Sequence, residues 1–167
     1  DIYSLYYGGW GLYNDEGSSY IRVENNLVYN CKSGAYHQHY GRENIIRNNI
    51  FANQIRTQLE ASRFEEHLSF SFTNNIVCYH TGVMCGINWT RVGHKSDYNS
   101  YFCTDSSQQI SFQGMSFDEW KQKGQDHNSV IANPEFTNAE TGDFTPKNKA
   151  LLKKIGFKMF DYTKAGV

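Results

Sequence analysis

The sequence predicts an all-β fold, a right-handed parallel β-helix with a C-terminal cap that contains a short helix. The first observation is a repeated Asn-Asn-aliphatic signature, which occurs as NNLVYN, NNIFAN and NNIVCY, with a weaker fourth copy, YNSYFC. Its second position advances by 23, 26 and 24 residues along the chain: Asn26, Asn49, Asn75 and Asn99. Periods in the twenties are typical of β-helices and of leucine-rich repeats, and the leucine-rich pattern is absent.

The second observation is the alternation of apolar and polar residues within each repeat. In YIRVENN, Ile21 and Val23 are apolar whereas Arg22 and Glu24 are charged, and LSFSFTNN alternates in the same way. A period of two predicts strands that bury one face. Stacked coils of such strands bury a continuous apolar column, and each coil contacts only its neighbours.

The repeated asparagines have a structural explanation. Asparagine tolerates the left-handed backbone conformation and bonds to nearby backbone groups, so it suits a tight corner between two strands. We expect Asn26, Asn49, Asn75 and Asn99 to occupy such corners and to stack as a ladder of side-chain amides. They are therefore not candidates for catalysis.

The chain divides into two parts. Residues 1–112 carry the rungs of the β-helix, and residues 113–167 form a cap and a wrap along its outside. A cap is needed because an exposed coil edge invites pairing with another chain. Within the second part, AETGDF predicts a turn and KALLKKIGF predicts either a short helical turn or an irregular wrap.

A short helix is expected at the start of the cap. Ser116 is followed three residues later by Glu119, which is the capping-box pattern. Gly124 then provides a natural stop. We expect the helix to run from Phe117 to about Lys123.

Composition narrows the class of partner. The net charge of -1 argues against a nucleic-acid partner, and no apolar run is long enough for a membrane span. Aromatic residues make up 16% of the chain, so we expect some rings to be exposed, where they suit sugar faces or a protein interface. The four cysteines form no CxxC pair, and we expect buried free thiols.

The first residues, DIYSLYYGGWG, predict the tail of a preceding rung. No capping element is visible there. We therefore expect further N-terminal rungs of the same protein, or another chain, to cover the first coil.

Two adjacent acids, Asp15 and Glu16, are the candidate catalytic residues. An offset of 23 residues stacks one block on the next: Tyr13 over Tyr36, Asn14 over His37, Asp15 over Gln38 and Glu16 over His39. Rungs lie about 4.8 Å apart, so carboxylates one rung apart suit a retaining glycosidase and carboxylates two rungs apart suit an inverting one. The partner carboxylate of Asp15 would be Glu16, an acid between residues 60 and 66, or an acid on a preceding rung. Alternatively, Asp15 caps a turn at Gly17.

The candidate substrate-binding residues surround these acids. They are aromatic rings, imidazoles and guanidinium groups that the repeat gathers on one strip: Trp10, Tyr13, Tyr36, His37, His39, Arg42, Arg63 and Trp89. The histidines would bond a substrate hydroxyl or orient an acid. The arginines would hold a sugar acid, or pair with Glu16. The tryptophans would stack on sugar rings, or pack coil ends.

No metal or other cofactor is expected. His37 and His39 would give only half of a metal site, and further ligands at a suitable spacing are not evident in the sequence. A Ca²⁺ ion would be expected only if the protein were a polysaccharide lyase on the same fold. Acidic ligands for the ion would then cluster on one strip of the surface.

YGGWGLYNDEGSSYIRVENNLVYN and HQHYGRENIIRNNIF resemble segments of right-handed β-helix glycoside hydrolases with a pectin-lyase-like fold, in particular glycoside hydrolase family 141. The ending, from WKQKGQDHNSVIANPEF onward, resembles the C-terminal segment of that group. The resemblance implies the C-terminal part of a larger, secreted or periplasmic enzyme that acts on a polysaccharide. It also places a catalytic carboxylate at Asp15, beside Glu16, with the partner acid about two rungs earlier.

Three functions fit these observations. The first is a glycoside hydrolase that cleaves plant or host polysaccharide by carboxylate acid–base chemistry. The second is a polysaccharide lyase on the same fold, with a Lys, Arg or Tyr base. The third is a non-catalytic β-helix used for binding or adhesion.

Overall fold

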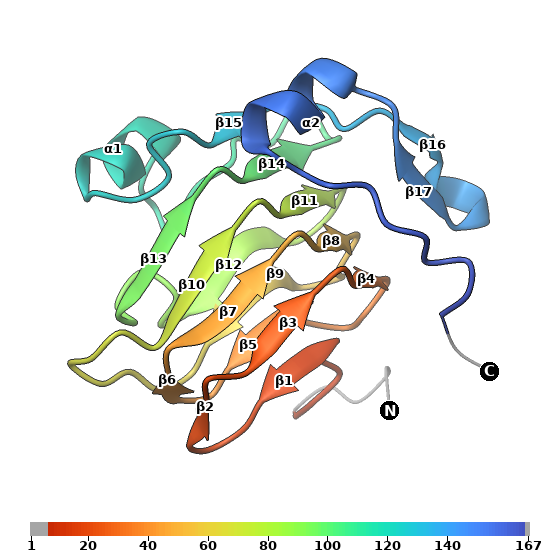
Figure 1. The fold of residues 1–167 in the computed structure, drawn as a ribbon. Helices are drawn as coiled ribbons and strands as arrows, with labels where there is room; N and C mark the ends of the chain where they lie inside the picture. Colours follow the sequence, from red (N-terminus) through yellow and green to blue (C-terminus); the bar gives the residue numbers. More distant parts are fainter. Residues whose placement is uncertain (1–6, 166–167) are drawn as a thin grey trace.

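The computed structural model describes residues 7–165 and confirms the parallel β-helix (Figure 1). Each of four turns contributes one strand to each of three parallel sheets. Residues 1–6, where most of the predicted tail of a preceding rung falls, lie outside the described residues.

The three sheets have strands of three to five residues, apart from the last strand of the third sheet. The first sheet contains β1 (Leu12–Asn14), β5 (Tyr36–Gln38), β9 (Thr57–Ala61) and β12 (Val83–Ile87). The second contains β3 (Arg22–Glu24), β7 (Asn44–Arg47), β10 (Phe70–Thr73) and β13 (His94–Asp97). The third contains β4 (Leu27–Tyr29), β8 (Ile50–Ala52), β11 (Ile76–Tyr79), β14 (Ser100–Cys103) and β15 (Val130–Ile131). A short parallel pair, β2 (Ser18–Ser19) and β6 (Gly41–Arg42), joins the first and second sheets of the first two turns.

The register of the first sheet corrects the predicted offset of 23 residues. Tyr13 pairs with His37, not with Tyr36, so the offset there is 24. The offset returns to 23 at Ser18, which pairs with Gly41. The turn between β1 and β2 is thus one residue longer than the turn between β5 and β6. A one-residue shift exchanges the two faces of a strand, which changes the predicted site.

The two residues of each asparagine pair have different roles. The first residue of each pair adopts the left-handed conformation, as do Asn25, Asn48 and Asn74, with Tyr98 in the fourth rung. The second residues form the predicted amide ladder, whose steps between amide nitrogen and oxygen are 3.0, 3.0 and 3.2 Å: Asn26, Asn49, Asn75 and Asn99. The ladder is therefore confirmed, whereas the left-handed residue is the one before it.

The inward-facing residues form an aromatic core. Phe51 and Phe72 stack with ring centroids 6.0 Å apart, and Phe70 lies 5.2 Å from Trp89. Tyr36 belongs to the same cluster and is fully buried. Burial of such large rings supplies most of the driving force for stacking the rungs.

The cap begins with the predicted helix, α1 (Phe117–Gln122). Ser116 and Glu119 form the capping box, and Gly124 has a positive φ of 88°. After α1, β15 pairs with β14, so the third sheet continues beyond residue 112, where we placed the end of the rungs. The coil edge is thus closed partly by a fifth strand of the sheet itself.

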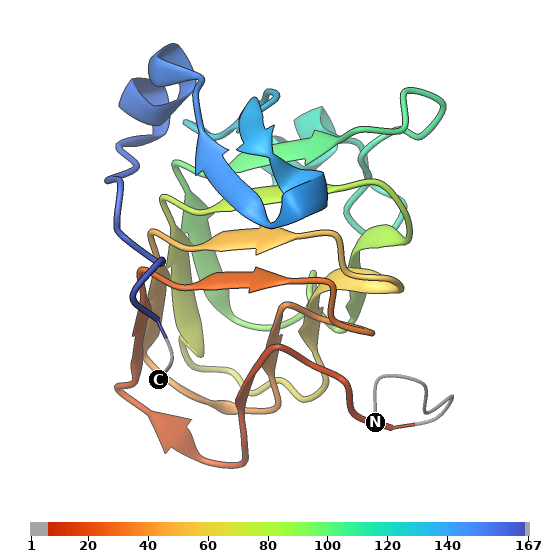
Figure 2. The ribbon, with the colours of Figure 1, turned by 90° about the vertical axis from the view of Figure 1, so that its right-hand side faces the viewer.

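The rest of the cap covers the outer face of the third sheet. An antiparallel hairpin of β16 (Phe136–Asn138) and β17 (Asp143–Pro146) lies across its strands (Figure 2). A single 3-10 turn, Ala139–Thr141, connects the two strands where the turn was predicted, and helix α2 (Lys149–Ile155) follows. Ile50 and Ile76, which point out of the sheet, are buried in a second cluster with cap residues. This cover explains why the third sheet is apolar on both faces.

The four cysteines are free thiols, and three of them are buried, as expected: Cys78, Cys85 and Cys103. Cys31 is half-buried. Among the described helices, none has the length and apolar character needed to cross a membrane.

Candidate functional site

The outward face of the first sheet brings together side chains from three rungs. Tyr13, His37 and Glu60 are register partners on β1, β5 and β9, so they form one outward column. Two residues further along each strand, His39 and Ser62 form the next column, because side chains of equal parity share a face. The backbone bond from Ser62 N–H to Gln38 C=O, 3.1 Å long, keeps these rungs aligned beyond the strand ends.

These columns border a pocket of about 430 Å³, which we call the Trp10 pocket. It is lined by aromatic rings, hydroxyls, imidazoles, one acid and two cations: Tyr7, Gly8, Trp10, Tyr13, Lys32, Ser33, His37, His39, Arg56, Thr57, Glu60 and Ser62. Trp10 and Tyr13 stack with centroids 4.6 Å apart and form a half-buried aromatic wall. Polar groups converging beside an aromatic wall are typical of ligand sites.

Glu60 is the acid of the pocket, and 4% of its surface is exposed. The indole N–H of Trp10 donates to its Oε2 at 2.8 Å. The hydroxyls of Ser33 and Thr57 both donate to Oε1. Both oxygens therefore accept hydrogen bonds, which fixes the carboxylate in place and compensates its burial.

His37 connects Glu60 to Ser62. Its Nδ1 lies 3.4 Å from Glu60 Oε2, and its Nε2 lies 2.8 Å from Ser62 Oγ. Ser62 Oγ also lies 2.9 Å from Nδ1 of His39. The Nδ1 of His37 has no hydrogen-bond partner within normal distance among the described residues. The side chains thus lie in the order carboxylate, imidazole, hydroxyl and second imidazole, with a 3.4 Å contact at the first step and hydrogen bonds at the other two.

The carboxylate decides the tautomer of His37. A bare Nδ1 facing Glu60 would place a lone pair against a negative oxygen, so the proton belongs on Nδ1. Nε2 is then the acceptor for the Ser62 hydroxyl proton, and His39 donates to Ser62 Oγ. Burial lowers the pKa of His37, although the charge of Glu60 opposes this shift. His37 is therefore a neutral imidazole at neutral pH, able to accept a proton.

Asp15 lies in the turn after β1 and is exposed, not in the pocket. Its backbone carbonyl accepts a bond from Ser18 N–H at 3.0 Å, so the turn is closed here by the main chain and not by the acid side chain. The hydroxyl of Tyr13 donates to its Oδ1 at 3.1 Å. The backbone N–H of Glu16 and the Tyr13 hydroxyl lower the pKa of Asp15, so it stays ionised. That state suits a base or a nucleophile, not a general acid.

Glu16 is exposed and paired on the surface. Arg63 Nη1 lies 3.6 Å from its Oε1, and the hydroxyl of Tyr40 donates to the same oxygen at 3.0 Å. Arg63 also covers the Tyr40 ring at 4.3 Å. The predicted ion-pair alternative for Glu16 is therefore present, with Arg63. Arg42 is exposed and borders a separate hollow on the side of β6.

Two predicted substrate-binding residues are corrected by the structure. Tyr36 is fully buried, and its hydroxyl donates to Gln38 Oε1 at 2.5 Å inside the β-helix. Trp89 is 1% exposed and packs against Phe70 and Phe72. Neither ring faces the surface, so neither lines a groove. The shift of one residue in register accounts for Tyr36, whereas Trp89 is the coil-end packing that was the alternative for it.

The predicted residues that meet at the pocket are Trp10, Tyr13, His37 and His39. Sequence reasoning missed Ser62 and the two cations, Lys32 and Arg56, and it named Glu60 only as one of several acids on the third rung. The 23-residue offset, carried from the second rung to the third, would have identified His37 and Glu60 as neighbours. Lys32 is buried and its Nζ donates to the carbonyl of Tyr7 at 3.3 Å.

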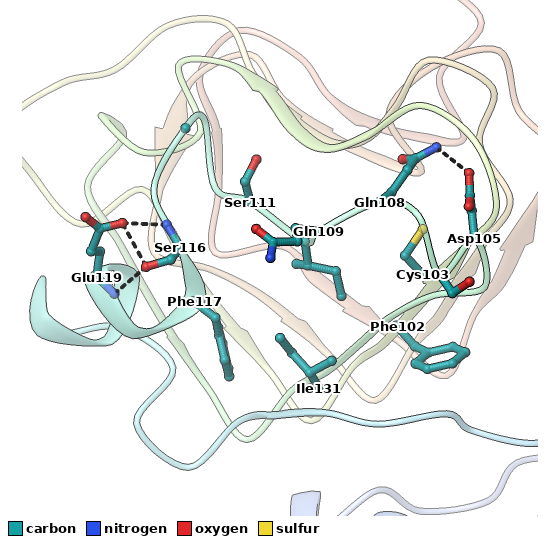
Figure 3. Close-up of a pocket in the computed structure, with 13 residues that line it drawn as sticks. Phe102, Cys103, Asp105, Gln108, Gln109, Ser111, Ser116, Phe117, Glu119 and Ile131 are labelled. Carbon is teal, nitrogen blue, oxygen red and sulfur yellow. Dashed lines mark hydrogen bonds between the residues drawn. The ribbon is translucent and has the colours of Figure 1, made fainter.

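A second cavity, of about 520 Å³, lies between α1 and the loop after β14 (Figure 3). Its acids have structural roles. Glu119 belongs to the capping box of α1, and Asp105 accepts bonds from the backbone and hydroxyl of Ser107 in a turn. This cavity is therefore a weaker candidate than the Trp10 pocket.

Within residues 7–165, no cluster of three or more His, Cys, Asp or Glu side chains is arranged to hold a metal ion. Comparisons of the sequence with protein families, with curated proteins and with solved structures gave no match for the chain.

Proposed function

We propose that this protein is a carbohydrate-active enzyme that binds a saccharide in the Trp10 pocket and hydrolyses a glycosidic bond. The observation that carries the proposal is the stacked wall of Trp10 and Tyr13 beside the fixed carboxylate of Glu60. Aromatic rings pack against the apolar faces of sugars, and fixed polar groups bond their hydroxyls.

Within this proposal Asp15 is the base or nucleophile. It is ionised, and Tyr13 connects it to the wall of the pocket. Glu16 supports the surrounding surface through its pair with Arg63. The acid that protonates the leaving group would come from a preceding rung, as the resemblance to family 141 implies.

A lyase that acts on a uronate is the second candidate, and one observation favours it. Lys32 and Arg56 line the pocket and would attract the carboxylate of a sugar acid. A lyase would leave an unsaturated sugar, which absorbs ultraviolet light, whereas hydrolysis would leave a new reducing end.

Binding is tested first, by isothermal titration calorimetry of neutral and uronic oligosaccharides against the protein. Trp10→Ala should weaken binding about tenfold or more, because the stacking surface is lost. Trp10→Phe keeps a ring but removes the N–H that Glu60 accepts, so it should bind more tightly than Trp10→Ala. Equal affinity for all three proteins would contradict the assigned site.

Turnover is tested next, on the oligosaccharides that bind. Asp15→Asn should lower the release of reducing ends by about 100-fold or more. Asp105→Asn is the matched control, because Asp105 is another turn aspartate with a lowered pKa, half-buried at the other cavity. Equal losses in both variants, or in neither, would refute the role of Asp15.

A further inference from the structure

The side chains of the Trp10 pocket include a group that glycosidic cleavage does not require. Ser62 Oγ lies 2.8 Å from Nε2 of His37, whose Nδ1 faces Glu60 at 3.4 Å. A hydroxyl, an imidazole and a carboxylate in this order make up the arrangement that activates a serine nucleophile. The contact between His37 and Glu60 is longer than a hydrogen bond, and catalytic contacts often shorten only when substrate binds.

We propose that Ser62 is a nucleophile for ester hydrolysis, with His37 as its base and Glu60 as the positioning residue for His37. The substrate class that fits the pocket is a saccharide carrying an O-acyl ester, with the sugar against Trp10 and Tyr13. The choice of sugar ester depends on the proposed saccharide binding, whereas the nucleophile does not.

The backbone explains why these three side chains meet. His37 and Glu60 are register partners on neighbouring strands, and Ser62 is two residues after Glu60 on the same face. The parallel ladder therefore fixes all three without a long loop. Ser62 lies just beyond β9 and is half-buried, so its hydroxyl is open to the pocket while its backbone N–H bonds to Gln38 C=O.

The proton positions suit attack by Ser62. Glu60 keeps the proton of His37 on Nδ1, so Nε2 is free to accept the proton of Ser62 Oγ. His39 approaches Ser62 Oγ from the other side at 2.9 Å and donates to it, which holds the hydroxyl in one orientation. Lys32 and Arg56 add positive charge to the same pocket, which favours the negative charge that develops on a carbonyl oxygen.

The reaction balances with water as the second reactant. Ser62 Oγ forms a bond to the ester carbon while its proton moves to Nε2 of His37. The bond from that carbon to the sugar oxygen then breaks, and the sugar hydroxyl takes the proton. Water next gives a proton to His37 and attacks the acyl carbon. Ser62 leaves and regains its proton, and a carboxylic acid is released.

The first test is covalent labelling with a fluorophosphonate, in which Ser62 Oγ displaces fluoride from phosphorus. The intact protein should gain one adduct, and peptide mapping should place it on Ser62. Ser62→Ala should not be labelled, whereas Ser106→Ala, at an exposed serine of the other cavity, should be labelled at the wild-type rate. Absence of labelling in the wild type, or labelling elsewhere, would overturn the proposal.

The second test is turnover of p-nitrophenyl acetate and of acetylated oligosaccharides. Ser62→Ala should lower kcat/KM by about 1000-fold or more, and His37→Gln by a similar factor. Glu60→Gln should both lower the rate and shift its pH profile, which a purely structural change would not do. Circular dichroism of each variant separates loss of chemistry from loss of fold.

The two proposals fail separately. If Ser62→Ala still binds saccharide but loses ester turnover, both stand. If no saccharide binds but Ser62 is labelled and turns over p-nitrophenyl acetate, the carbohydrate proposal falls and the nucleophile remains. If saccharide binds and Ser62→Ala turns over esters at the wild-type rate, the nucleophile is refuted.

Discussion

His94 lies in an aromatic stack at the last complete rung of the β-helix. Its ring stacks on the ring of Phe70, with centroids 4.9 Å apart, and on that of Trp120, with centroids 5.8 Å apart. Its Nδ1 bonds to the carbonyl of Val92 at 3.0 Å, whereas its Nε2 has no partner among the described residues. Burial lowers the pKa of His94, against the opposing effect of the Val92 bond and of Asp126. The ring is therefore a neutral packing element.

This burial predicts a loss of stability in acid. Below about pH 6.5 the unfolded chain takes up a proton at this histidine that the folded chain does not, so folding weakens as pH falls. Above that pH His94 is neutral in both the folded and the unfolded chain, so this loss of stability is absent. We expect a lower free energy of unfolding at pH 5.5 than at pH 7.5 in urea titrations. His94→Phe keeps the ring stack and should show a smaller difference, because one of the two buried histidines is gone. An unchanged difference would contradict the interpretation.

At the scale of the element, the asparagine ladder stabilises one corner of every rung. Asn75 is fully buried and accepts the backbone N–H of Asn49 at 3.0 Å, while its amide donates to Ile46 C=O and to Asn99. Asn75→Ala would leave an N–H and a carbonyl without partners inside the protein. Each such group costs about 1–3 kcal/mol.

We therefore expect Asn75→Ala to lower the free energy of unfolding by about 3 kcal/mol or more, measured by urea denaturation. Asn26→Ala is the matched control, because Asn26 is at the end of the ladder and is only half-buried. Water can replace its lost bonds, so its cost should be near 1 kcal/mol. Similar losses for both variants would refute a cooperative ladder.

The fourth rung is the exception at the corner that carries the asparagine pairs. Tyr98 has φ of 56° in the place that Asn25, Asn48 and Asn74 occupy in the other rungs. A residue with a β-carbon and no local polar group loses roughly 1–2 kcal/mol in this conformation. Tyr98 is exposed, so little packing would be lost on substitution. Tyr98→Asn should raise the free energy of unfolding by about 1 kcal/mol, whereas Tyr98→Phe should not. A decrease for Tyr98→Asn would contradict the strain argument.

The elements also show what sequence could and could not predict. The asparagine pairs and the alternation in LSFSFTNN, whose Phe70 and Phe72 are buried, predict the rungs, because corner chemistry and strand period are local properties. Ile21, which the same alternation in YIRVENN places on the buried face, is 43% exposed on the first rung.

Which face of each strand points into the β-helix is not a local property, because the register against the neighbouring strand sets it. One extra residue in the turn before Ser18 shifts β1 against β5, and this shift hid the meeting of Tyr13 with His37. The site depends on that register, so only half of it could be predicted.

At the scale of the whole molecule, the cap is attached through outer residues of the corners. Asn48 and Lys158 exchange two hydrogen bonds of 2.7 Å between side-chain amide and backbone. Asn74 donates to the carbonyl of Ile155 at 2.6 Å. Beneath these bonds, Ile155 and Phe157 are buried in the second hydrophobic cluster. The left-handed asparagines therefore serve both the turn of the chain and the docking of its C-terminal segment.

Asn48→Gly separates these two roles, because glycine keeps the left-handed backbone but has no side chain to hold Lys158. We expect residues 156–165 to exchange amide hydrogens faster and trypsin to cleave sooner after Lys158, since the two lost bonds are worth roughly 1–3 kcal/mol together. Asn30→Gly is the control, because Asn30 is an exposed left-handed asparagine with the same change in backbone freedom. The rungs should keep their exchange protection in both variants. Equal exchange of the C-terminal segment in the two variants would show that the apolar contacts of Ile155 and Phe157 alone hold it against the β-helix.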